Sequence, residues 1–414
     1  MADILVLGAG MVGVSTALAL QTRGHAVSLV DRGAPGRETS FGNAGIIQAE
    51  AAEPYGLPRD LGTLWSFATG RSNDVTWSLR GVAQMAPALW SYFRHSAPRR
   101  HAGISRSYAQ LTARATADHA PLIEAAGAGN LITRDGLVQL YRSGAAFEAD
   151  AADAERLGRE YGVRHRALSG TDYRREDPAL RGDPAGVIHW SDSWSCSAPG
   201  CLVHAYARLF AGRGGRLLEG DAETLTQTFG GWRVRTVAED VEAEHAVVAL
   251  GPWSPSLLRR FGYRIPMIYK RGYHGHFETA QPPLRPIVDM DNGVVAGQMQ
   301  AGLRIATGAA LVARGAPADL RQLDRGRAAL SDMLEIGARV EEPQWSGTRP
   351  CLPGMLPLAG EAPRHKGLWF HFGHGHQGFT LGPTTAALLA GRLDGTLDDG
   401  ESALSQVLSP ANRP

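Results

Sequence analysis

Residues 4–13 read Ile4-Leu5-Val6-Leu7-Gly8-Ala9-Gly10-Met11-Val12-Gly13. An apolar run that leads directly into the spacing G-x-G-x-x-G predicts a buried strand, a tight turn and the start of a helix. The helix is expected to end near Gly24, and a second apolar run over 26–30 places an acid, Asp31, at its end. This order predicts the first βαβ unit of a dinucleotide-binding fold.

The three glycines of the turn have separate geometric roles. Gly8 permits the tight turn, Gly10 lets the main chain approach a pyrophosphate, and Gly13 lets the helix pack close to the strand. The N-terminus of the helix then faces the phosphates, where its N–H groups and its dipole favour negative charge. Asp31 is expected to face the ribose hydroxyls. Because an acid there would repel a 2′-phosphate, NADP is not expected.

The composition limits the class of protein. A chain of 414 residues exceeds what one core usually supports, so two lobes are expected. The net charge of +1 argues against nucleic-acid binding, which normally needs a basic excess. The three cysteines are too few and too unevenly spaced for a disulfide framework or a zinc site. Neither a secretory signal nor an apolar run of about 18 residues is visible, so a cytoplasmic protein is expected.

The nucleotide-binding lobe is expected to be discontinuous along the chain. The run Ala246-Val247-Val248-Ala249-Leu250-Gly251 predicts a strand buried on both faces, which belongs in a parallel sheet beside the first strand. Alternating residues in 265–277, 284–290, 293–298 and 303–307 predict the sheet of a second lobe. Leucines at helical spacing predict a helix over residues 318–337.

Two segments have alternative interpretations. Residues 60–98 are expected to be helical and carry a series of aromatic side chains. Within them, residues 89–94 are interpreted as core, with contact to a lipid surface as the alternative. The loop 192–197 is interpreted as a surface turn, with a place in a ligand pocket as the alternative.

A second glycine-rich turn lies near the C-terminus. The apolar residues 368–372 predict a strand, which leads into Gly373-His374-Gly375-His376-Gln377-Gly378 and then into a helix of small residues. Backbone N–H groups in such a turn can bind an anion or the electron-rich edge of a ring. One nucleotide-binding turn near each end of the chain indicates a long cofactor held at two places, which fits FAD better than NAD.

Taken in order, the motifs resemble those of a known family. They are the N-terminal glycine motif, Glu38-Thr39-Ser40-Phe41-Gly42-Asn43-Ala44-Gly45, Ala249-Leu250-Gly251-Pro252-Trp253-Ser254, Lys270-Arg271-Gly272-Tyr273, Gly347-Thr348-Arg349-Pro350 and the C-terminal glycine-rich turn. Over nearly the whole chain, they resemble the FAD-dependent D-amino acid dehydrogenase and glycine oxidase family, and most closely its bacterial D-amino acid dehydrogenase branch.

The resemblance implies an α/β fold of two lobes. The FAD-binding lobe would be a Rossmann fold of the glutathione-reductase type, built from residues 1–85, 190–256 and 345–414. The substrate-binding lobe, residues 86–189 and 257–344, would carry a mixed, largely antiparallel sheet.

The resemblance also implies a reaction and the roles of four residues. Hydride would pass from Cα of a small amino acid, expected to be D-configured, to flavin N5, and the imino acid would be hydrolysed to a 2-oxo acid and ammonia. Arg349 matches the arginine that pairs with the substrate carboxylate, which a planar guanidinium can hold with two parallel donors. Tyr273 and Tyr55 would hydrogen-bond this carboxylate and close the pocket. His374 would donate a hydrogen bond toward the reduced flavin.

The FAD site is expected to draw on every motif. Its predicted residues are Gly8, Gly10, Met11, Val12, Gly13, Asp31, Arg32, Thr39, Ser40, Asn43, Ala44, Gly45, Ile46, Leu250, Gly251, Trp253, Gly375, His376, Gln377, Gly378, Phe379 and Thr380.

No metal site is expected: His371, His374 and His376 lie close in sequence, but no cluster of acids accompanies them. Two departures from the family pattern stand out. Gly354 replaces a common acid, and His376-Gln377 replaces Thr-Leu, so the pyrimidine edge of the flavin would be contacted differently.

The acceptor and the substrate leave alternatives open. The leading expectation is electron transfer to a quinone-type acceptor, with peripheral contact to the inner face of a membrane. The alternative within the family is an oxygen-using oxidase of glycine, sarcosine or a cyclic imino acid such as hydroxyproline. Two more distant alternatives are an NAD-dependent dehydrogenase, which would be colourless, and a flavoprotein without catalytic activity.

Overall fold

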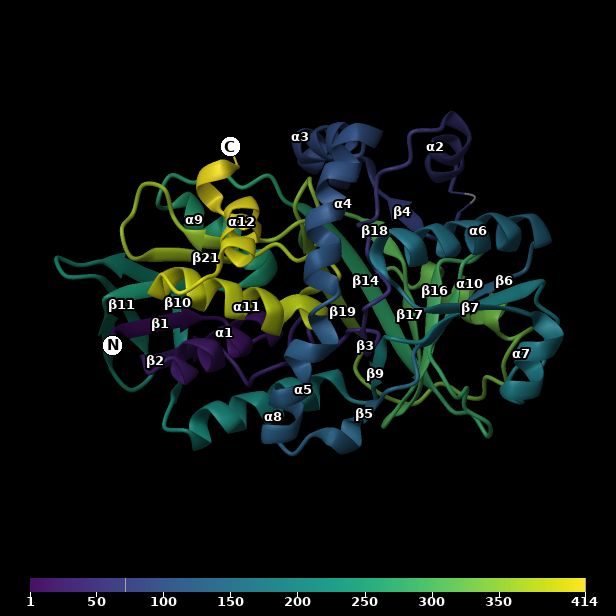
Figure 1. Ribbon diagram of the computed structural model, residues 1–414, viewed down its shortest axis with the longest axis horizontal. Helices are drawn as coiled ribbons and strands as arrows, with labels where there is room; N and C mark the ends of the chain where they lie inside the picture. The colour runs from purple at the N-terminus through teal and green to yellow at the C-terminus, as the bar shows by residue number, and fades with distance from the viewer. Residues whose placement is uncertain (71, 414) are drawn as a thin grey trace.

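The computed structural model describes residues 1–70 and 72–413. Its strands form two large sheets that lie side by side in Figure 1. Between them, the short strands β3 (Ile46–Ile47), β9 (Trp194–Cys196) and β5 (Ile132–Thr133) form a third sheet. Across the two described ranges, no helix combines the length and the apolar character that a membrane crossing needs.

The first sheet has eight strands in the order β12-β11-β10-β2-β1-β13-β21-β20. Their bounds are β1 (Asp3–Leu7), β2 (Ala26–Asp31), β10 (Arg216–Gln227), β11 (Trp232–Thr236), β12 (Asp240–Ala243), β13 (His245–Val248), β20 (Leu358–Glu361) and β21 (Leu368–Phe372). The strands β10, β2, β1, β13 and β21 run parallel to one another. The predicted pairing of the first strand with the apolar strand near 246 is therefore confirmed, with Leu5 opposite Ala246.

Helices cover both faces of the first sheet. On one face lie α1 (Met11–Thr22), α8 (Pro199–Gly212) and α11 (Gly378–Asp394), accompanied by α4 (Pro98–Thr112), α5 (Ala115–Ala125) and α12 (Asp399–Leu408). The other face is covered by α9 (Ser254–Arg259), whose Leu257 and Leu258 pack with Leu5 and Leu7 of β1. The strand, turn and helix predicted from residues 4–24 are confirmed.

The second sheet has ten strands, in the order β4-β18-β14-β17-β16-β15-β6-β8-β7 with β19 paired to β14. Their bounds are β4 (Val75–Trp77), β6 (Leu137–Tyr141), β7 (His165–Ser169), β8 (Gly186–Trp190), β14 (Ile268–Phe277), β15 (Ile287–Asp289), β16 (Val294–Met299), β17 (Gly302–Thr307), β18 (Ala309–Leu311) and β19 (Trp345–Cys351). Only the pairs β15–β6 and β18–β4 are parallel, so the predicted mixed and largely antiparallel sheet is confirmed.

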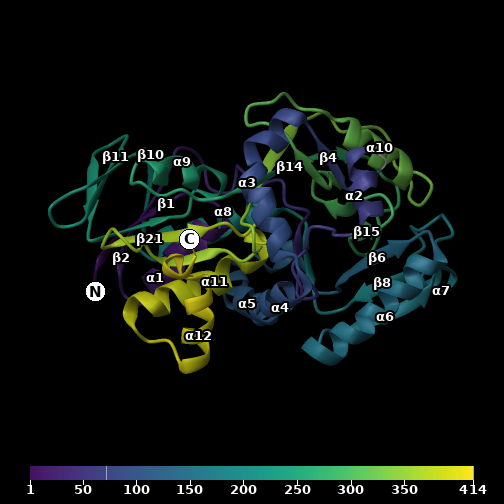
Figure 2. The same ribbon diagram turned by 90° about the horizontal axis from the view of Figure 1, so that it is seen from above.

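The remaining helices surround this sheet. They are α2 (Leu61–Ala68), α3 (Leu79–His95), α6 (Gly144–Tyr161), α7 (Gly170–Glu176) and α10 (Arg321–Leu330), with the 3-10 turns η1 (Gly129–Leu131), η2 (Gly251–Trp253) and η3 (Pro410–Asn412) elsewhere in the chain. Figure 1 shows α2, α3 and β4 at the top of the molecule, and Figure 2, seen from above, also shows them close together.

The structure differs from the expected boundaries where short strands change sheets. Within 60–98 the strand β4 separates α2 from α3 and joins the second sheet, and β19 also joins that sheet, although residues 1–85 and 345–414 were expected in the FAD-binding lobe. Conversely, α4 and α5 pack in the core around α1 and α11. Residues 192–197 contain β9, which pairs with β3, and are not a surface turn.

Candidate active site

A cavity of about 990 Å³ is walled by both glycine-rich turns, by β14 and by β19. Ligand pockets span roughly 300–1,000 Å³, so this cavity has the size that a long dinucleotide needs. Eighteen predicted cofactor residues line it, namely Gly8, Gly10, Met11, Val12, Asp31, Arg32, Thr39, Ser40, Asn43, Ala44, Ile46, Leu250, Gly251, Trp253, Gly375, His376, Gly378 and Phe379. Arg349, Tyr55 and His374 line it as well.

The N-terminal turn owes its shape to main-chain contacts. Gly8 has φ of +106°, and a Cβ atom on it would lie 2.6 Å from the carbonyl oxygen of Ala249. A Cβ atom on Gly13 would lie 1.7 Å from the carbonyl oxygen of Gly8. The carboxylate of Asp31 accepts a hydrogen bond of 2.6 Å from the N–H of Ala9, so this acid also holds the turn. Its contact with ribose stays a prediction.

Four predicted cofactor residues lie behind the cavity wall. Gly13 packs α1 against the turn, and Gly45 is held by its N–H, which donates to the side chain of Asn43 at 2.8 Å. Gln377 donates to the side chain of Gln48 at 3.0 Å, and the hydroxyl of Thr380 accepts from the N–H of Gln48 at 3.3 Å. These two residues therefore position Gln48, a wall residue that the sequence did not single out.

Two helix N-termini at the cavity fit the phosphate and ring edge of FAD. Neither α1, which begins after Gly10, nor α11, which begins after Gln377, is capped by the side chain of its N-cap residue, although Oγ of Ser40 accepts from the N–H of Met11 at 3.1 Å. An uncapped helix start leaves N–H groups and a positive dipole end for an anion. Near the second start, Nε2 of His376, which lines the cavity, is buried without a hydrogen-bond partner within the described residues. This unsatisfied polar atom and the free N–H groups of α11 fit a polar ring edge in the cavity.

Arg349 extends from β19 into the cavity with donors to spare. Its Nη1 donates to the carbonyl of Gly308 at 2.5 Å and its Nη2 to that of Thr307 at 2.9 Å. A guanidinium has five N–H donors, so three remain. Burial lowers the pKa of Arg349, but the group stays cationic at neutral pH. Among the described residues it forms no salt bridge, which leaves a fixed cation ready for a carboxylate.

Lys270 is a second cation of the cavity wall that the sequence-based reasoning missed as a site residue. It lies directly opposite Arg349 in the β14–β19 ladder, and its Nζ is 3.4 Å from the hydroxyl of Tyr92. Burial opposes its charge, but Tyr92 and Cys351 raise the pKa of Lys270 above its ordinary value. The signal was present in composition, because Lys270 and Lys366 are the only lysines in a chain rich in arginine.

Tyr273 does not reach the cavity, which corrects its predicted role. The neighbouring Gly272 lines the cavity, and successive residues of a strand point to opposite faces of the sheet. The ring of Tyr273 is 2% exposed, and its hydroxyl accepts a weak hydrogen bond of 3.4 Å from the N–H of Asp319 on the far face. Tyr55, in contrast, lies at the cavity with its ring 5.2 Å from that of His376.

His374 lines the cavity, but its proton is engaged elsewhere. Its Nε2 lies 2.9 Å from the hydroxyl of Thr385, which itself donates to the carbonyl of Leu381. The histidine must therefore be the donor of that pair, and its Nδ1 can only accept. Burial lowers the pKa of His374 to about 3, so the ring is neutral. The predicted donation toward the reduced flavin does not fit this arrangement.

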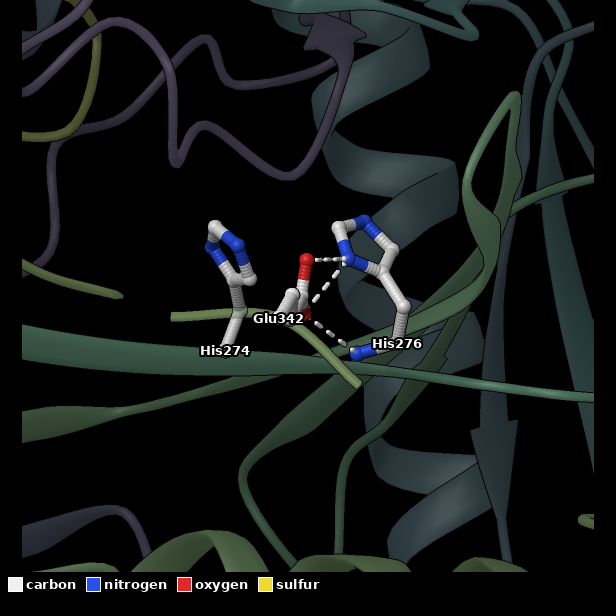
Figure 3. A group of neighbouring side chains, drawn as sticks. All are labelled: His274, His276 and Glu342. Carbon is white, nitrogen blue, oxygen red and sulfur yellow. Dashed lines mark hydrogen bonds and ion pairs between the residues drawn. The ribbon is translucent and has the colours of Figure 1, made fainter. Parts of the chain in front are cut away.

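Metal-ligating side chains gather beside the cavity rather than at the C-terminal histidines. Among the described residues, His274, His276 and Glu342 offer ligand atoms within 4.8 Å of one another (Figure 3). Nδ1 of His276 bonds Glu342 at 2.8 Å, and its Nε2 accepts from Nε of Arg304 at 3.0 Å. A metal ion would have to break these bonds beside a fixed positive charge. Arg304 also donates to the carbonyl of Asn43, so the group holds the FAD-side loop against the second sheet.

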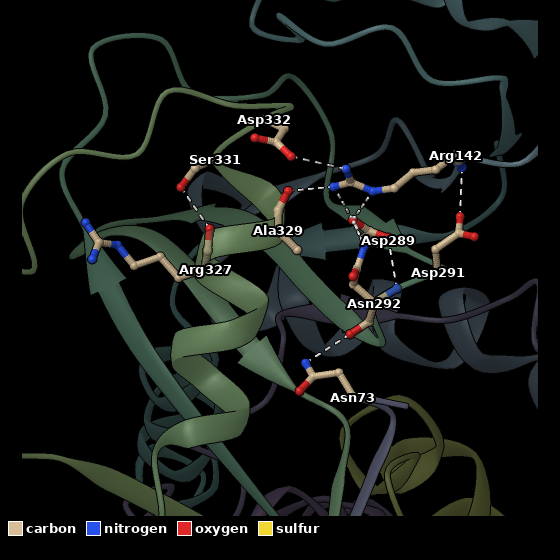
Figure 4. A network of polar contacts seen from close by, with 9 residues as sticks. All are labelled: Asn73, Arg142, Asp289, Asp291, Asn292, Arg327, Ala329, Ser331 and Asp332. Carbon is tan, nitrogen blue, oxygen red and sulfur yellow. Dashed lines mark hydrogen bonds and ion pairs between the residues drawn. The ribbon is translucent and has the colours of Figure 1, made fainter. Parts of the chain in front are cut away.

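A polar network positions the far wall of the cavity (Figure 4). Arg142 donates to the buried carboxylate of Asp289 at 2.8 Å, and Asn292 donates to the same group at 3.0 Å. The carbonyl of Asn292 accepts from the amide of Asn73 at 3.0 Å. This chain of contacts fixes Asp74 at the cavity wall, where burial raises the pKa of its carboxyl group.

The fold and the site together define the class of protein. Residues 3–392 match the family of FAD dependent oxidoreductases known as DAO, and the chain belongs to this family. The protein is thus an FAD-dependent oxidoreductase of α/β architecture.

Individual relatives cover nearly the whole chain. A D-amino acid dehydrogenase of Chromohalobacter salexigens is 29% identical over 95% of this chain and 96% of its own. A D-amino-acid oxidase of Bradyrhizobium diazoefficiens is also 29% identical, over 95% of each protein. Among solved structures, glycine oxidase from Geobacillus kaustophilus has a similar fold, with a TM-score of 0.73 and 20% identity over 96% of each chain.

Proposed function

We propose that the protein oxidatively deaminates D-amino acids and passes the electrons to a quinone-type acceptor. The observation that carries the proposal is Arg349, a cation without a salt-bridge partner among the described residues and with three free donors in the cavity that both FAD turns line. A small amino acid supplies the carboxylate that this group lacks. The names of the two curated relatives support the D-configuration.

The residues of the chain bind and orient this substrate. Arg349 holds the carboxylate with two parallel donors and thereby fixes the position of Cα. When bound, FAD supplies the acceptor for the hydride that leaves Cα. Lys270 adds a second positive charge, which lowers the pKa of the substrate ammonium and favours the neutral amine. His374 stays neutral and its N–H is engaged by Thr385, so this histidine gives no proton to the reaction, and water hydrolyses the imino acid to a 2-oxo acid and ammonia.

An oxygen-using oxidase is the second candidate. It is favoured by the oxidase relative, which is as similar to this chain as the dehydrogenase relative is. The same cavity residues would bind the amino acid in both cases, since the two functions differ only in the acceptor. We favour a quinone at the periphery of a membrane because of an exposed apolar surface beside the cavity, described below.

Replacing Arg349 tests the substrate class. For Arg349→Met we expect kcat/KM for amino acids to fall by roughly 30-fold to several thousand-fold, since an unpaired buried carboxylate costs about 2–5 kcal/mol. Arg349→Lys keeps the charge but loses the paired donors, and we expect it to recover only part of the loss. The exposed Arg159→Met serves as the control and should behave like the parent. Unchanged turnover in Arg349→Met would show that no carboxylate is held there.

Anaerobic bleaching of the flavin separates the remaining alternatives. We expect the bound flavin to be bleached by D-amino acids and not by their L-enantiomers. Colour should then return quickly with a quinone analogue and slowly in air. Fast return in air would establish the oxidase, and the absence of bleaching by any amine would favour a flavoprotein without this activity.

A further inference from the structure

One edge of the molecule exposes large apolar side chains that no core requires. They are Leu61 (84% exposed), Trp65 (65%), Trp77 (43%), Leu79 (79%) and Trp90 (63%), and we call them the apical surface. They come from α2, β4 and α3, which lie together in both views (Figures 1 and 2). Monomeric proteins rarely gather such side chains outside a functional surface.

The local structure presents these side chains outward. The helix α2 has no buried residue at all. It is tied to β4 by Nε1 of Trp77, which donates to the carbonyl of Phe67 at 2.9 Å. On α3, the residues Leu79, Ala83, Pro87 and Trp90 recur at helical spacing and are all exposed, while Met85, Ala88 and Tyr92 are buried. The helix therefore has an apolar face toward solvent as well as one toward the core.

Positive charge predominates around the apical surface. Residues 75–117 contain no aspartate or glutamate, although the whole chain has a net charge of only +1. Arg80, Arg94, Arg99 and Arg100 are exposed there, and none forms a salt bridge within the described residues. Aspartates border the region only at Asp60, which caps α2, and at Asp74, which faces the cavity.

We propose that the apical surface docks on an anionic lipid membrane. Exposed tryptophan and leucine side chains beside an excess of arginines are typical of an interfacial helix. The rings enter the headgroup region and the arginines meet lipid phosphates. A second copy of this chain fits less well, since a symmetric contact would place the same arginines against one another.

The position of α2 connects this surface to the reaction. Its Leu64 and Phe67 line the cavity, whereas Leu61 and Trp65 are exposed. Trp77 of β4 belongs both to the cavity wall and to the apical surface, so the FAD site lies directly behind the docked face. A quinone dissolved in the bilayer would thus meet the protein beside the cavity. This last step rests on the proposed function, but docking itself does not.

Vesicle flotation of the FAD-loaded protein tests the docking. The parent should float with phosphatidylcholine vesicles that contain phosphatidylglycerol, and weakly with phosphatidylcholine alone or at high salt. In Trp65→Ser/Trp90→Ser the bound fraction at limiting lipid should fall at least about tenfold. Phe229→Ser is the matched control, because Phe229 is 111% exposed in the β10–β11 turn, far from α2 and α3 in Figure 1. It should float like the parent.

Two further readouts separate the possible failures. Turnover of a D-amino acid with a water-soluble dye should be equal in all three proteins, because neither tryptophan lines the cavity. Loss of this turnover in the parent would overturn the proposed function and leave the docking in place. The docking is overturned if the parent and the double variant float equally, if anionic lipid makes no difference, or if the double variant halves the molar mass in light scattering, which would identify an interface between copies.

Discussion

At the scale of single residues, the cavity depends on a lysine in a chain that otherwise uses arginine. An ammonium is a compact point charge, whereas a guanidinium is a planar fork with fixed donor directions. Opposite each other in the β14–β19 ladder, Lys270 and Arg349 divide these roles. The arginine can hold a planar carboxylate, and the lysine sets the potential around it.

Removing the lysine charge should change the pH profile. In Lys270→Met we expect the apparent pKa of the acid limb of kcat to rise by roughly one unit, because the substrate ammonium is no longer destabilised by a like charge. Lys270→Arg should keep most of the parent profile. The exposed Lys366→Met is the control for lysine loss. An unmoved acid limb in Lys270→Met would remove this residue from the electrostatics of the site.

Site residues could be predicted from the sequence where a motif determines the course of the main chain. They could not be predicted where the tertiary structure decides which way a side chain points or where its proton lies. The glycine turns brought Gly8 and Gly375 to the cavity as predicted. The predicted role of Tyr273 was wrong because the alternation of residues along β14 does not reveal which face of the strand lines the cavity. The predicted donation by His374 was wrong because the position of its proton depends on Thr385, eleven residues further along the chain.

At the scale of elements, strong periodicity predicted the strands and helices that stand in the middle of a layer. The strand β4 was missed because it has three residues at the edge of its sheet, too few for a period to show within a helical pattern. The helix expected over residues 318–337 is shorter in the structure, because α10 spans only Arg321–Leu330 while Met333 and Leu334 continue the buried cluster from a turn. The existence of β4 and the end of α10 are therefore determined by tertiary packing and not by the periodicity of the sequence.

The contact between α1 and its turn yields a sharp prediction. In Gly13→Ala the new methyl group would lie 1.7 Å from the carbonyl oxygen of Gly8, a main-chain atom that cannot move aside as a flexible side chain can. We expect the free energy of unfolding to drop by at least about 3 kcal/mol and the purified protein to lose its yellow colour. Gly33→Ala, which meets nothing within 4 Å, should keep both. A yellow Gly13→Ala protein of normal stability would contradict the packing described here.

At the scale of the whole molecule, buried neutral histidines couple stability to pH. His119 joins α5 to α8 and α11 through bonds to Tyr206 and to the carbonyl of Phe379, and burial lowers its pKa to about 4. The unfolded chain therefore takes up this proton first as the pH falls. The stabilising effect of the neutral ring is complete above about pH 6.5 and is lost on acidification toward about pH 4.

Denaturation at two pH values measures this coupling. Between pH 7 and pH 5, His119 alone should account for a loss of about 2 kcal/mol in the free energy of unfolding. In His119→Gln the difference between the two pH values should shrink by about that amount, even if the variant is less stable overall. The exposed His204→Gln should leave it unchanged. An equal pH difference in all three proteins would exclude His119 as a contributor.

The strand β19 has a consequence for motion between the two sheets. It pairs with β14 in the second sheet, yet the carbonyl of Pro350 accepts from the N–H of Gly375 at 2.9 Å, and Cys351 bridges to His374 in the C-terminal turn. If the two sheets were to move relative to each other, β19 and the C-terminal turn would move together because these bonds join them. Arg349, which is expected to bind the carboxylate, would then keep its position relative to the part of the cavity wall that this turn forms. These contacts keep the distance between Arg349 and the C-terminal turn constant, and with it the position of Cα relative to the flavin.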